Sequence, residues 1–264
     1  MAMSSFRPET VVAIDAVKTA LVTAREGTGE VHFKEGRDVV TDTDVLIEDA
    51  IRAEAEGAFG FPVIGEERGG AAPEGTPYWL VDPICGTRNF ASHIPLFAIN
   101  MALVEDGEVV VAVVGDGSTG ELHIAERGRG AWSLRADLLV PLSVDAGSQV
   151  VDFEGWPPPG GQRDRAARFV TAGFTANHWD IRCLSSTLAL AYVAAGRLAA
   201  CVLFKAPSSV HVAAGSLLVL EAGGSLTDLD RGRWTVDSTS MLASGTEEFH
   251  HELLVAWSAS QGDM

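Results

Sequence analysis

Residues 79–90 read Trp-Leu-Val-Asp-Pro-Ile-Cys-Gly-Thr-Arg-Asn-Phe. The apolar start is typical of a buried strand, and Gly86-Thr87 begins what the pattern predicts to be a helix. The sequence therefore places a carboxylate, Asp82, and a thiol, Cys85, where the predicted strand ends. A thiolate is a nucleophile or a ligand for soft metals, whereas Mg²⁺ prefers oxygen. The residue at position 85 thus decides which chemistry this stretch supports.

Hydrophobic spacing around this stretch predicts helices followed by an antiparallel sheet. Apolar positions recur at helical spacing over 8–26 and 43–58, and short apolar runs at 61–65 and 78–81 read as strands. Asp106-Gly107 separates two further apolar runs, 96–104 and 108–115, and is a strong hairpin signal. Residues 120–132 extend the same predicted sheet.

A loop predicted over 154–165, which contains Gly155-Trp-Pro-Pro-Pro-Gly-Gly, marks the boundary to a second half. Beyond it the sequence predicts a helix near 186–195, a strand at 199–204 and a helix at 210–221 that ends before a glycine pair. We therefore expect an α+β fold with layered αβαβα packing. We expect one domain over 1–264, with sub-domains of roughly 1–145 (helices plus antiparallel sheet) and 146–264 (α/β).

The composition excludes several classes of function. A net charge of −17 argues against binding to nucleic acid or to an anionic membrane, because both require a basic face. No apolar run is long enough to span a bilayer, and the first residues lack the layout of a signal peptide. Three cysteines do not make a disulfide framework, so a reduced cytoplasmic setting is expected. Cys183 and Cys201 lie in apolar contexts and are predicted to be small buried residues.

Five ordered blocks of the sequence carry a resemblance to a known family. They are Asp38-Val-Val-Thr-Asp-Thr-Asp44, Gly65-Glu-Glu67, Asp82–Phe90, Gly120–Ala131 and Val210-His-Val-Ala-Ala-Gly with Glu221-Ala-Gly-Gly. Together they resemble the inositol monophosphatase superfamily, and the resemblance implies the fold of that superfamily, with catalytic Mg²⁺ held by four carboxylates.

The four ligand positions carry Glu66, Asp82, Cys85 and His211 in this chain. Two of the four carboxylates are thus replaced. At the substrate end, the resemblance puts Phe204 where the family has a substrate-contacting Glu, and Val210 where it has a Trp. We therefore expect no metal and no other cofactor in this chain, and a substrate pocket lined by Phe204, Val210 and Arg88.

Residues that share an ion in the family should face each other here. A thiol beside an imidazole is a nucleophile–base pair, and Asp82 or Glu66 is placed to orient His211. The amides of Gly86 and Thr87, at the start of the predicted helix, would stabilise an oxyanion, and the helix N-terminus would lower the pKa of the Cys85 thiol. The same four side chains also suit zinc, an alternative that the residues leave open.

A Cys-His pair on this scaffold is similar to the Dieckmann cyclases that release tetramic acids and pyridones in antibiotic biosynthesis. That resemblance implies a Cys85-His211-Asp82 triad, which takes a β-ketoamide chain from a phosphopantetheine thioester on a carrier protein and closes its ring. A homodimer is a further expectation from the superfamily. Two alternatives stay open: a metal-dependent phosphomonoesterase with a remodelled metal site, and a catalytically dead member used for binding.

Overall fold

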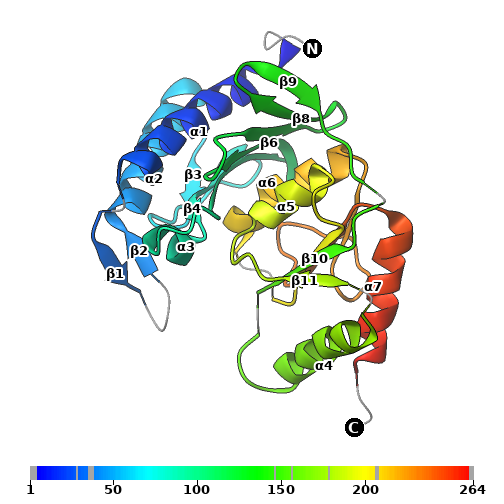
Figure 1. Ribbon diagram of the computed structural model, residues 1–264. Coiled ribbons are helices and arrows are strands. Elements are labelled where there is room, and N and C mark those ends of the chain that lie inside the picture. The colour runs from blue at the N-terminus through cyan, green and yellow to red at the C-terminus, as the bar shows by residue number, and fades with distance from the viewer. Residues whose placement is uncertain are drawn as a thin grey trace.

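Two large β-sheets and three layers of helices stack in the order helix, sheet, helix, sheet, helix (Figure 1). The computed structural model describes residues 5–27, 29–34, 39–145, 147–155, 157–177, 179–205 and 208–261. None of the helices in these ranges is long and apolar enough to cross a membrane. The predicted layered αβαβα packing is confirmed.

The first sheet has seven strands in chain order, all antiparallel except the first pair. Its central strands are apolar on both faces because helices cover both sides. The strands are β3 (Val63–Gly65), β4 (Tyr78–Cys85), β5 (Ala98–Glu105), β6 (Glu108–Asp116), β7 (Leu122–Glu126), β8 (Gly130–Arg135) and β9 (Leu138–Pro141).

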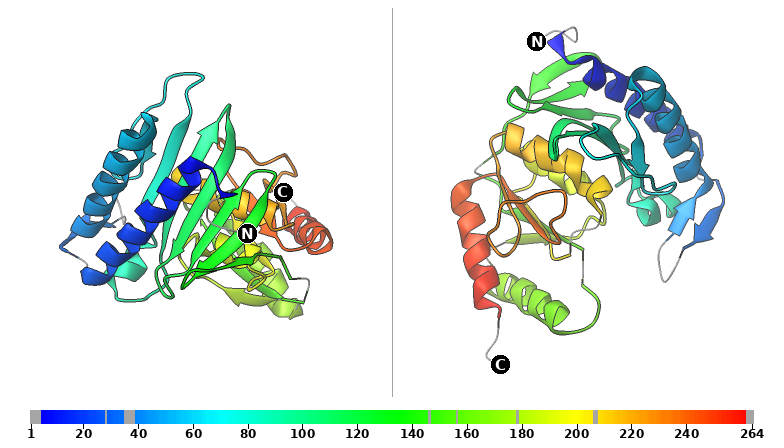
Figure 2. Two further views of the ribbon diagram at one scale, coloured as in Figure 1. Left: turned by 90° about the horizontal axis from the view of Figure 1, so that it is seen from above. Right: turned by 180° about the vertical axis from the view of Figure 1, so that it is seen from behind.

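Helices α1 (Pro8–Glu26) and α2 (Asp42–Phe59) cover the outer face of this sheet (Figure 2). Thr41 and Asp44 form a capping box that fixes the start of α2, and Gly60 ends it in the left-handed conformation. The short strands β1 (Val31–Phe33) and β2 (Val39–Thr41) pair ahead of this cap. Thr41 is both the last residue of β2 and the cap of α2, so the cap joins this strand pair to the helix layer.

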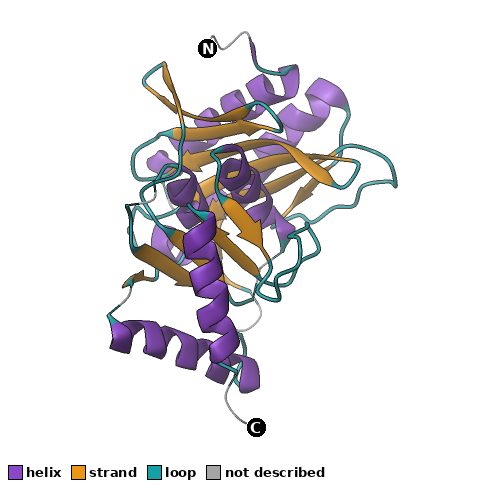
Figure 3. Ribbon diagram, turned by 90° about the vertical axis from the view of Figure 1, so that its right-hand side faces the viewer, coloured by secondary structure: helices purple, strands orange, loops and turns teal. Residues whose placement is uncertain are grey.

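The second sheet has the order β11-β10-β12-β14-β13. Helices α5 (Leu188–Ala194) and α6 (Ser209–Glu221) lie between the two sheets, while α4 (Gly161–Ala176) and α7 (Glu247–Ala259) lie on the outer face of the second (Figures 1 and 3). Because α6 is enclosed by both sheets, most of its residues are apolar and buried. The strands are β10 (Val150–Glu154), β11 (Asp180–Arg182), β12 (Ala200–Leu203), β13 (Ser225–Thr227) and β14 (Met241–Ser244). The five-residue helix α3 (Thr87–Ala91) follows β4.

Candidate active site

A β-bulge brings Asp82 and Cys85 to the same site. In a regular strand, residues three apart point to opposite faces. Here Asp82 pairs with Asn100 and Cys85 pairs with Ala98, so β4 uses one more residue than β5 over the same interval. The extra residue re-aims the end of β4, as bulges beside active sites commonly do. Because of this bulge, the side chains of Asp82 and Cys85 point to one site instead of to opposite faces of the sheet.

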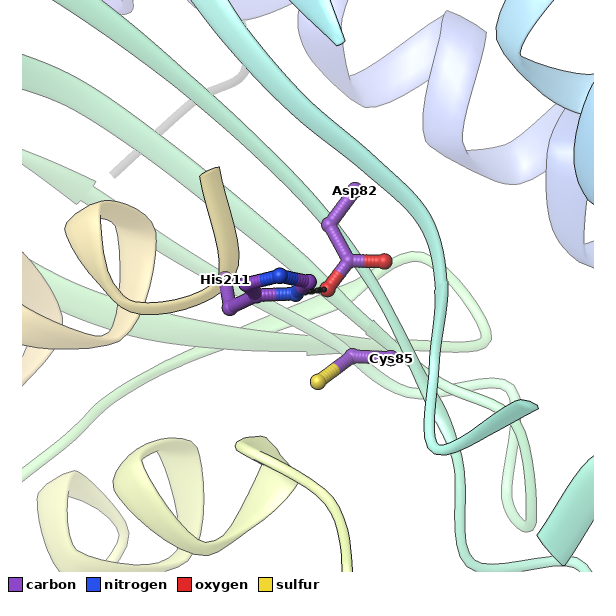
Figure 4. Close-up of side chains that lie close together, drawn as sticks. All are labelled: Asp82, Cys85 and His211. Atoms are coloured by element: carbon purple, nitrogen blue, oxygen red, sulfur yellow. Dashed lines mark hydrogen bonds and ion pairs between the residues drawn. The ribbon is translucent and has the colours of Figure 1, made fainter. Parts of the chain in front are cut away.

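His211 completes the group from the first turn of α6. Its Nδ1 lies 2.7 Å from Oδ2 of Asp82, and the Cys85 thiol lies beside the ring (Figure 4). Ligand atoms of Asp82, Cys85 and His211 all lie within 4.8 Å of one another. The structure thus brings together three residues that are as much as 129 positions apart in the sequence.

Thr187, at the start of α5, holds the thiol in place. Its hydroxyl lies 2.8 Å from Cys85 Sγ, and its backbone amide donates to the same sulfur at 3.3 Å. Asn100 on β5 donates both to Thr187 Oγ1, at 3.2 Å, and to Asp82 Oδ2, at 3.4 Å. Sequence reasoning missed Thr187 and Asn100, because a Ser-Ser-Thr run and a single Asn in an apolar strand form no motif.

Glu66 follows β3 and faces the same group. Its Oε2 lies 4.0 Å from His211 Nδ1, and Lys34 donates to its Oε1 at 3.4 Å. Burial, together with the nearby Asp82 charge, raises the pKa of Glu66 to about 8. Asp82 is fully buried, and its Oδ1 has no hydrogen-bond partner among the described residues. Of the two side chains proposed to orient His211, Asp82 makes the direct hydrogen bond.

The electrostatics of the thiol differ from the prediction. Burial, reinforced by the Asp82 charge, raises the pKa of Cys85, although His211 and Thr187 oppose the shift. The helix expected to lower this pKa is only five residues long, so its dipole is short. Burial alone would lower the pKa of His211, but the charge and hydrogen bond of Asp82 raise it well above the usual histidine value. The neutral thiol and the charged imidazole are therefore favoured at neutral pH.

Two cavities open at this group, and both are lined by Cys85, Ser185 and His211. The first has a volume of about 310 Å³, and the second about 250 Å³. The first is completed by Val39, Glu66, Ile84, Gly86, Thr87 and Arg88, and the second by Glu154, Gly155, Ser186, Thr187, Leu203 and Lys205. The imidazole and the thiol thus stand between two hollows.

The structure places the other predicted residues as follows. Gly86, Thr87 and Arg88 line the first cavity, whereas Phe204 and Val210 line neither. Phe204 is buried in an aromatic cluster of the second sheet and stacks on Phe153 at 5.8 Å. Phe204 therefore makes packing contacts, and its expected role in the substrate pocket stays a prediction.

Val210 is buried in the core between the two sheets. Cys201 is buried as expected, whereas Cys183 is exposed. Asp38, in the first sequence block, lies outside the described residues.

Known sequences identify the family to which this fold and this site belong. The chain matches the Inositol monophosphatase family over residues 7–261 and belongs to that family. It is 36% identical to an inositol-1-monophosphatase of Mesorhizobium japonicum over 232 residues, which cover 86% of this chain and 85% of that protein. It is also 36% identical to a histidinol-phosphatase of Mycobacterium tuberculosis over 203 residues, 72% of this chain and 74% of the relative.

Solved structures agree with this assignment. The extragenic suppressor protein suhB of Bartonella henselae superposes with a TM-score of 0.85 at 28% identity, covering 95% of this chain and 98% of that one. An IMPase of Thermotoga maritima gives a TM-score of 0.81 at 27% identity, covering 94% and 96%.

These relatives overturn the Dieckmann cyclase hypothesis. Relatives that match most of the chain include an inositol-1-monophosphatase and a histidinol-phosphatase, so the prediction of a cysteine-dependent cyclase acting on a thioester to give a tetramic acid or pyridone is wrong. The expectation of a carrier-protein partner followed only from that hypothesis. The physical flaw lay in treating the closeness of Cys85 and His211 as sufficient, because burial raises the pKa of the thiol that had to ionise.

Proposed function

We propose that this protein hydrolyses a phosphate monoester with the help of a bound divalent cation. The observation that carries the proposal is a fully buried carboxylate, Asp82, whose Oδ1 has no hydrogen-bond partner among the described residues; Asp82 contacts His211, which lines a cavity together with Glu66. A carboxylate oxygen buried without a donor is costly. A cation held between Asp82 and Glu66 would satisfy that oxygen and offset the burial and the Asp82 charge that raise the pKa of Glu66.

The donor set near this oxygen fits a cation. Asp82 and Glu66 would hold it, because the two carboxylates face the same space. Asp82 Oδ2 lies 2.7 Å and Glu66 Oε2 lies 4.0 Å from His211 Nδ1. A divalent cation supplies positive charge for the phosphate oxygens and makes water more acidic. Lys34, which contacts Glu66 and Glu67, keeps part of this acidic wall paired at one side.

The chain itself would position the substrate. Arg88 is exposed at the first cavity and offers a guanidinium that matches phosphate geometry, and Gly86 and Thr87 form the wall beside it. The second cavity, across His211 and Cys85, would receive the alcohol part of the ester. In the reaction, a water oxygen bonds to phosphorus, the ester P–O bond breaks, and the alcohol leaves with a proton. The hydrophobic Leu203 and the polar Glu154 and Lys205 would then contact the leaving alcohol.

Phosphate release tests the proposal. We expect release from inositol 1-phosphate, histidinol phosphate or p-nitrophenyl phosphate with at least one of Mg²⁺, Mn²⁺, Co²⁺ or Zn²⁺, and none after chelation. Asp82→Asn should abolish it, because the amide no longer supplies an anionic ligand. Asp180→Asn, a matched change at an exposed position on β11, should not alter it. No release with any of these cations, or full release by Asp82→Asn, would contradict the proposal.

A further inference from the structure

We infer that Asp82, Cys85 and His211 form a binding site for a borderline or soft divalent cation, Zn²⁺ or Co²⁺, and select it over Mg²⁺. The inference deepens the proposed function, on which it rests for the role of the ion but not for its binding.

The first observation is the donor set. One carboxylate, one thiol and one imidazole present ligand atoms within 4.8 Å of one another (Figure 4). Zn²⁺ accepts sulfur, nitrogen and oxygen at about 2.0–2.3 Å, and these three ligand atoms are close to the spacing at which one ion contacts all of them. Mg²⁺ instead requires near-octahedral oxygen ligands and binds neither thiolate nor imidazole well. The residues present therefore do not suit the Mg²⁺ of the related family at this position.

The second observation concerns hydrogen bonding and not the choice of ligand residues. Asp82 is 0% exposed, and its Oδ1 has no partner among the described residues. The other oxygen of the same carboxylate accepts from Asn100 and lies 2.7 Å from His211. The neighbouring Cys85, Thr187 and Asn100 side chains all have hydrogen-bond partners, so the unpaired oxygen marks a place where a positive ligand is expected.

The third observation is the support behind the ligands. Thr187 holds Cys85 Sγ through its hydroxyl and its amide, and Asn100 donates to both Thr187 and Asp82. Metal ligands are commonly oriented by hydrogen bonds of this kind, whose loss costs about 10–100-fold in metal affinity. The thiol, the carboxylate and the imidazole are thus held together before any ion binds.

The experiment measures binding, not turnover. The full chain is freed of metal with a chelator and titrated with Co²⁺, while the near-ultraviolet charge-transfer absorption of a Co²⁺–thiolate bond is recorded. Zn²⁺ and Mg²⁺ are each titrated by calorimetry. We expect one Co²⁺ per chain with the charge-transfer band, displacement of that Co²⁺ by Zn²⁺, and no displacement by Mg²⁺.

Variants assign the ligands. Cys85→Ser should abolish the band, whereas Cys183→Ser, the matched change at an exposed cysteine, should keep it. His211→Gln should weaken Co²⁺ binding by at least about 10–100-fold, since it removes a direct ligand rather than a supporting contact. His251→Gln, at an exposed position of α7, should leave binding unchanged. Circular dichroism of each variant establishes that it folds. The double variant Cys85→Asp/His211→Asp, which supplies oxygen ligands only, should bind Mg²⁺ and lose the preference for Co²⁺.

Two results would overturn the inference: no stoichiometric Co²⁺ or Zn²⁺ binding by the parent chain, or a charge-transfer band that persists in folded Cys85→Ser. These failures are distinct from failure of the proposed function. Phosphate release with Mg²⁺ and no Co²⁺–thiolate band would refute the choice of metal alone. A Zn²⁺-loaded chain that releases no phosphate with any cation would refute the hydrolysis alone.

Discussion

Replacing Glu66 with Gln should stabilise the metal-free protein, and the gain should grow with pH. The pKa of Glu66 rises from 4.5 to about 8, first because the side chain is buried and second because Asp82 lies nearby. A difference of one in pKa corresponds to about 1.4 kcal/mol. At pH 7 the unfolded chain carries an ionised glutamate that the folded chain must protonate, which by linkage costs about 3 kcal/mol. At pH 5 the unfolded glutamate is only partly ionised, and the same linkage gives about 1 kcal/mol.

The sign follows from the direction of the shift. The folded pKa lies above the unfolded one, so the contribution to stability is fully present below pH 4.5 and is lost as the pH rises towards 8. The glutamine of the variant would not titrate, so the stability of the variant minus that of the parent should rise by about 2 kcal/mol between pH 5 and pH 7. Loss of the Lys34 contact lowers the variant by a similar amount at both values and does not change this difference.

Urea unfolding followed by tryptophan fluorescence, in the presence of a chelator, measures the effect. Glu74→Gln, the same change at an exposed loop position, is the matched control. If the gain of Glu66→Gln were equal at pH 5 and pH 7, the assigned cost of burying this carboxylate would be wrong. Saturation with Zn²⁺ should stabilise the parent more than Glu66→Gln, because Glu66 is proposed to contribute to cation binding.

Three further changes test the packing and the electrostatics. Phe204→Ala should lower the free energy of unfolding, measured in urea, by about 3–5 kcal/mol, because it leaves a cavity in an aromatic cluster. The variant should keep the same order of preferred substrates. A changed order would indicate that Phe204 contacts the substrate. Gly86→Ala should cost about 1–3 kcal/mol in the same assay, since φ is 102° and the added Cβ would lie 3.0 Å from a backbone oxygen; a stability equal to the parent's would refute that strain. His123 is fully buried, and burial lowers its pKa to about 4, so its ring signals in NMR should not titrate between pH 8 and pH 5.5. The stability linked to the neutral imidazole is present above pH 6.5 and declines as the pH falls towards 4. A titration midpoint near 6.5 would contradict the effect of burial.

Much of the fold follows from local sequence signals. The helix predicted over 8–26 is α1 (Pro8–Glu26), and the helix predicted over 210–221 is α6 (Ser209–Glu221). The Asp106-Gly107 hairpin joins β5 to β6 as expected. Strong periodicity, turn residues and terminal glycines made these elements readable.

Elements with weaker local signals were missed. α4 (Gly161–Ala176) begins inside the segment predicted as a loop, because Gly and Pro precede it and its apolar positions are few. α7 (Glu247–Ala259) and β10 (Val150–Glu154) were not predicted either. Both depend on packing within the second sheet, where β10 pairs with strands that follow it by some 30 to 50 residues.

The candidate site was likewise predictable only in part from the sequence. The identities of Asp82, Cys85 and His211 and their common location follow from the sequence blocks, since residues that replace ligands of one ion must lie close together. The bulge in β4 that turns Asp82 and Cys85 to one side does not, because the registers of β4 and β5 are set by pairing over the whole strand. Nor does Thr187, which reaches Cys85 across 102 residues. These unpredicted contacts are the ones that fix the environment of the thiol.

That environment distinguishes two uses of the same three residues. A nucleophilic thiol needs a lowered pKa, but burial and the Asp82 charge raise the pKa of Cys85. A metal ligand tolerates both burial and a neighbouring carboxylate, because a cation that binds displaces the thiol proton and neutralises the carboxylate. The negative charge that opposes a free thiolate therefore favours a thiolate bound to a metal. The same reasoning accounts for Asp82 Oδ1, since a charge relay through His211 uses only the oxygen that the imidazole already engages, whereas a cation would also satisfy the other.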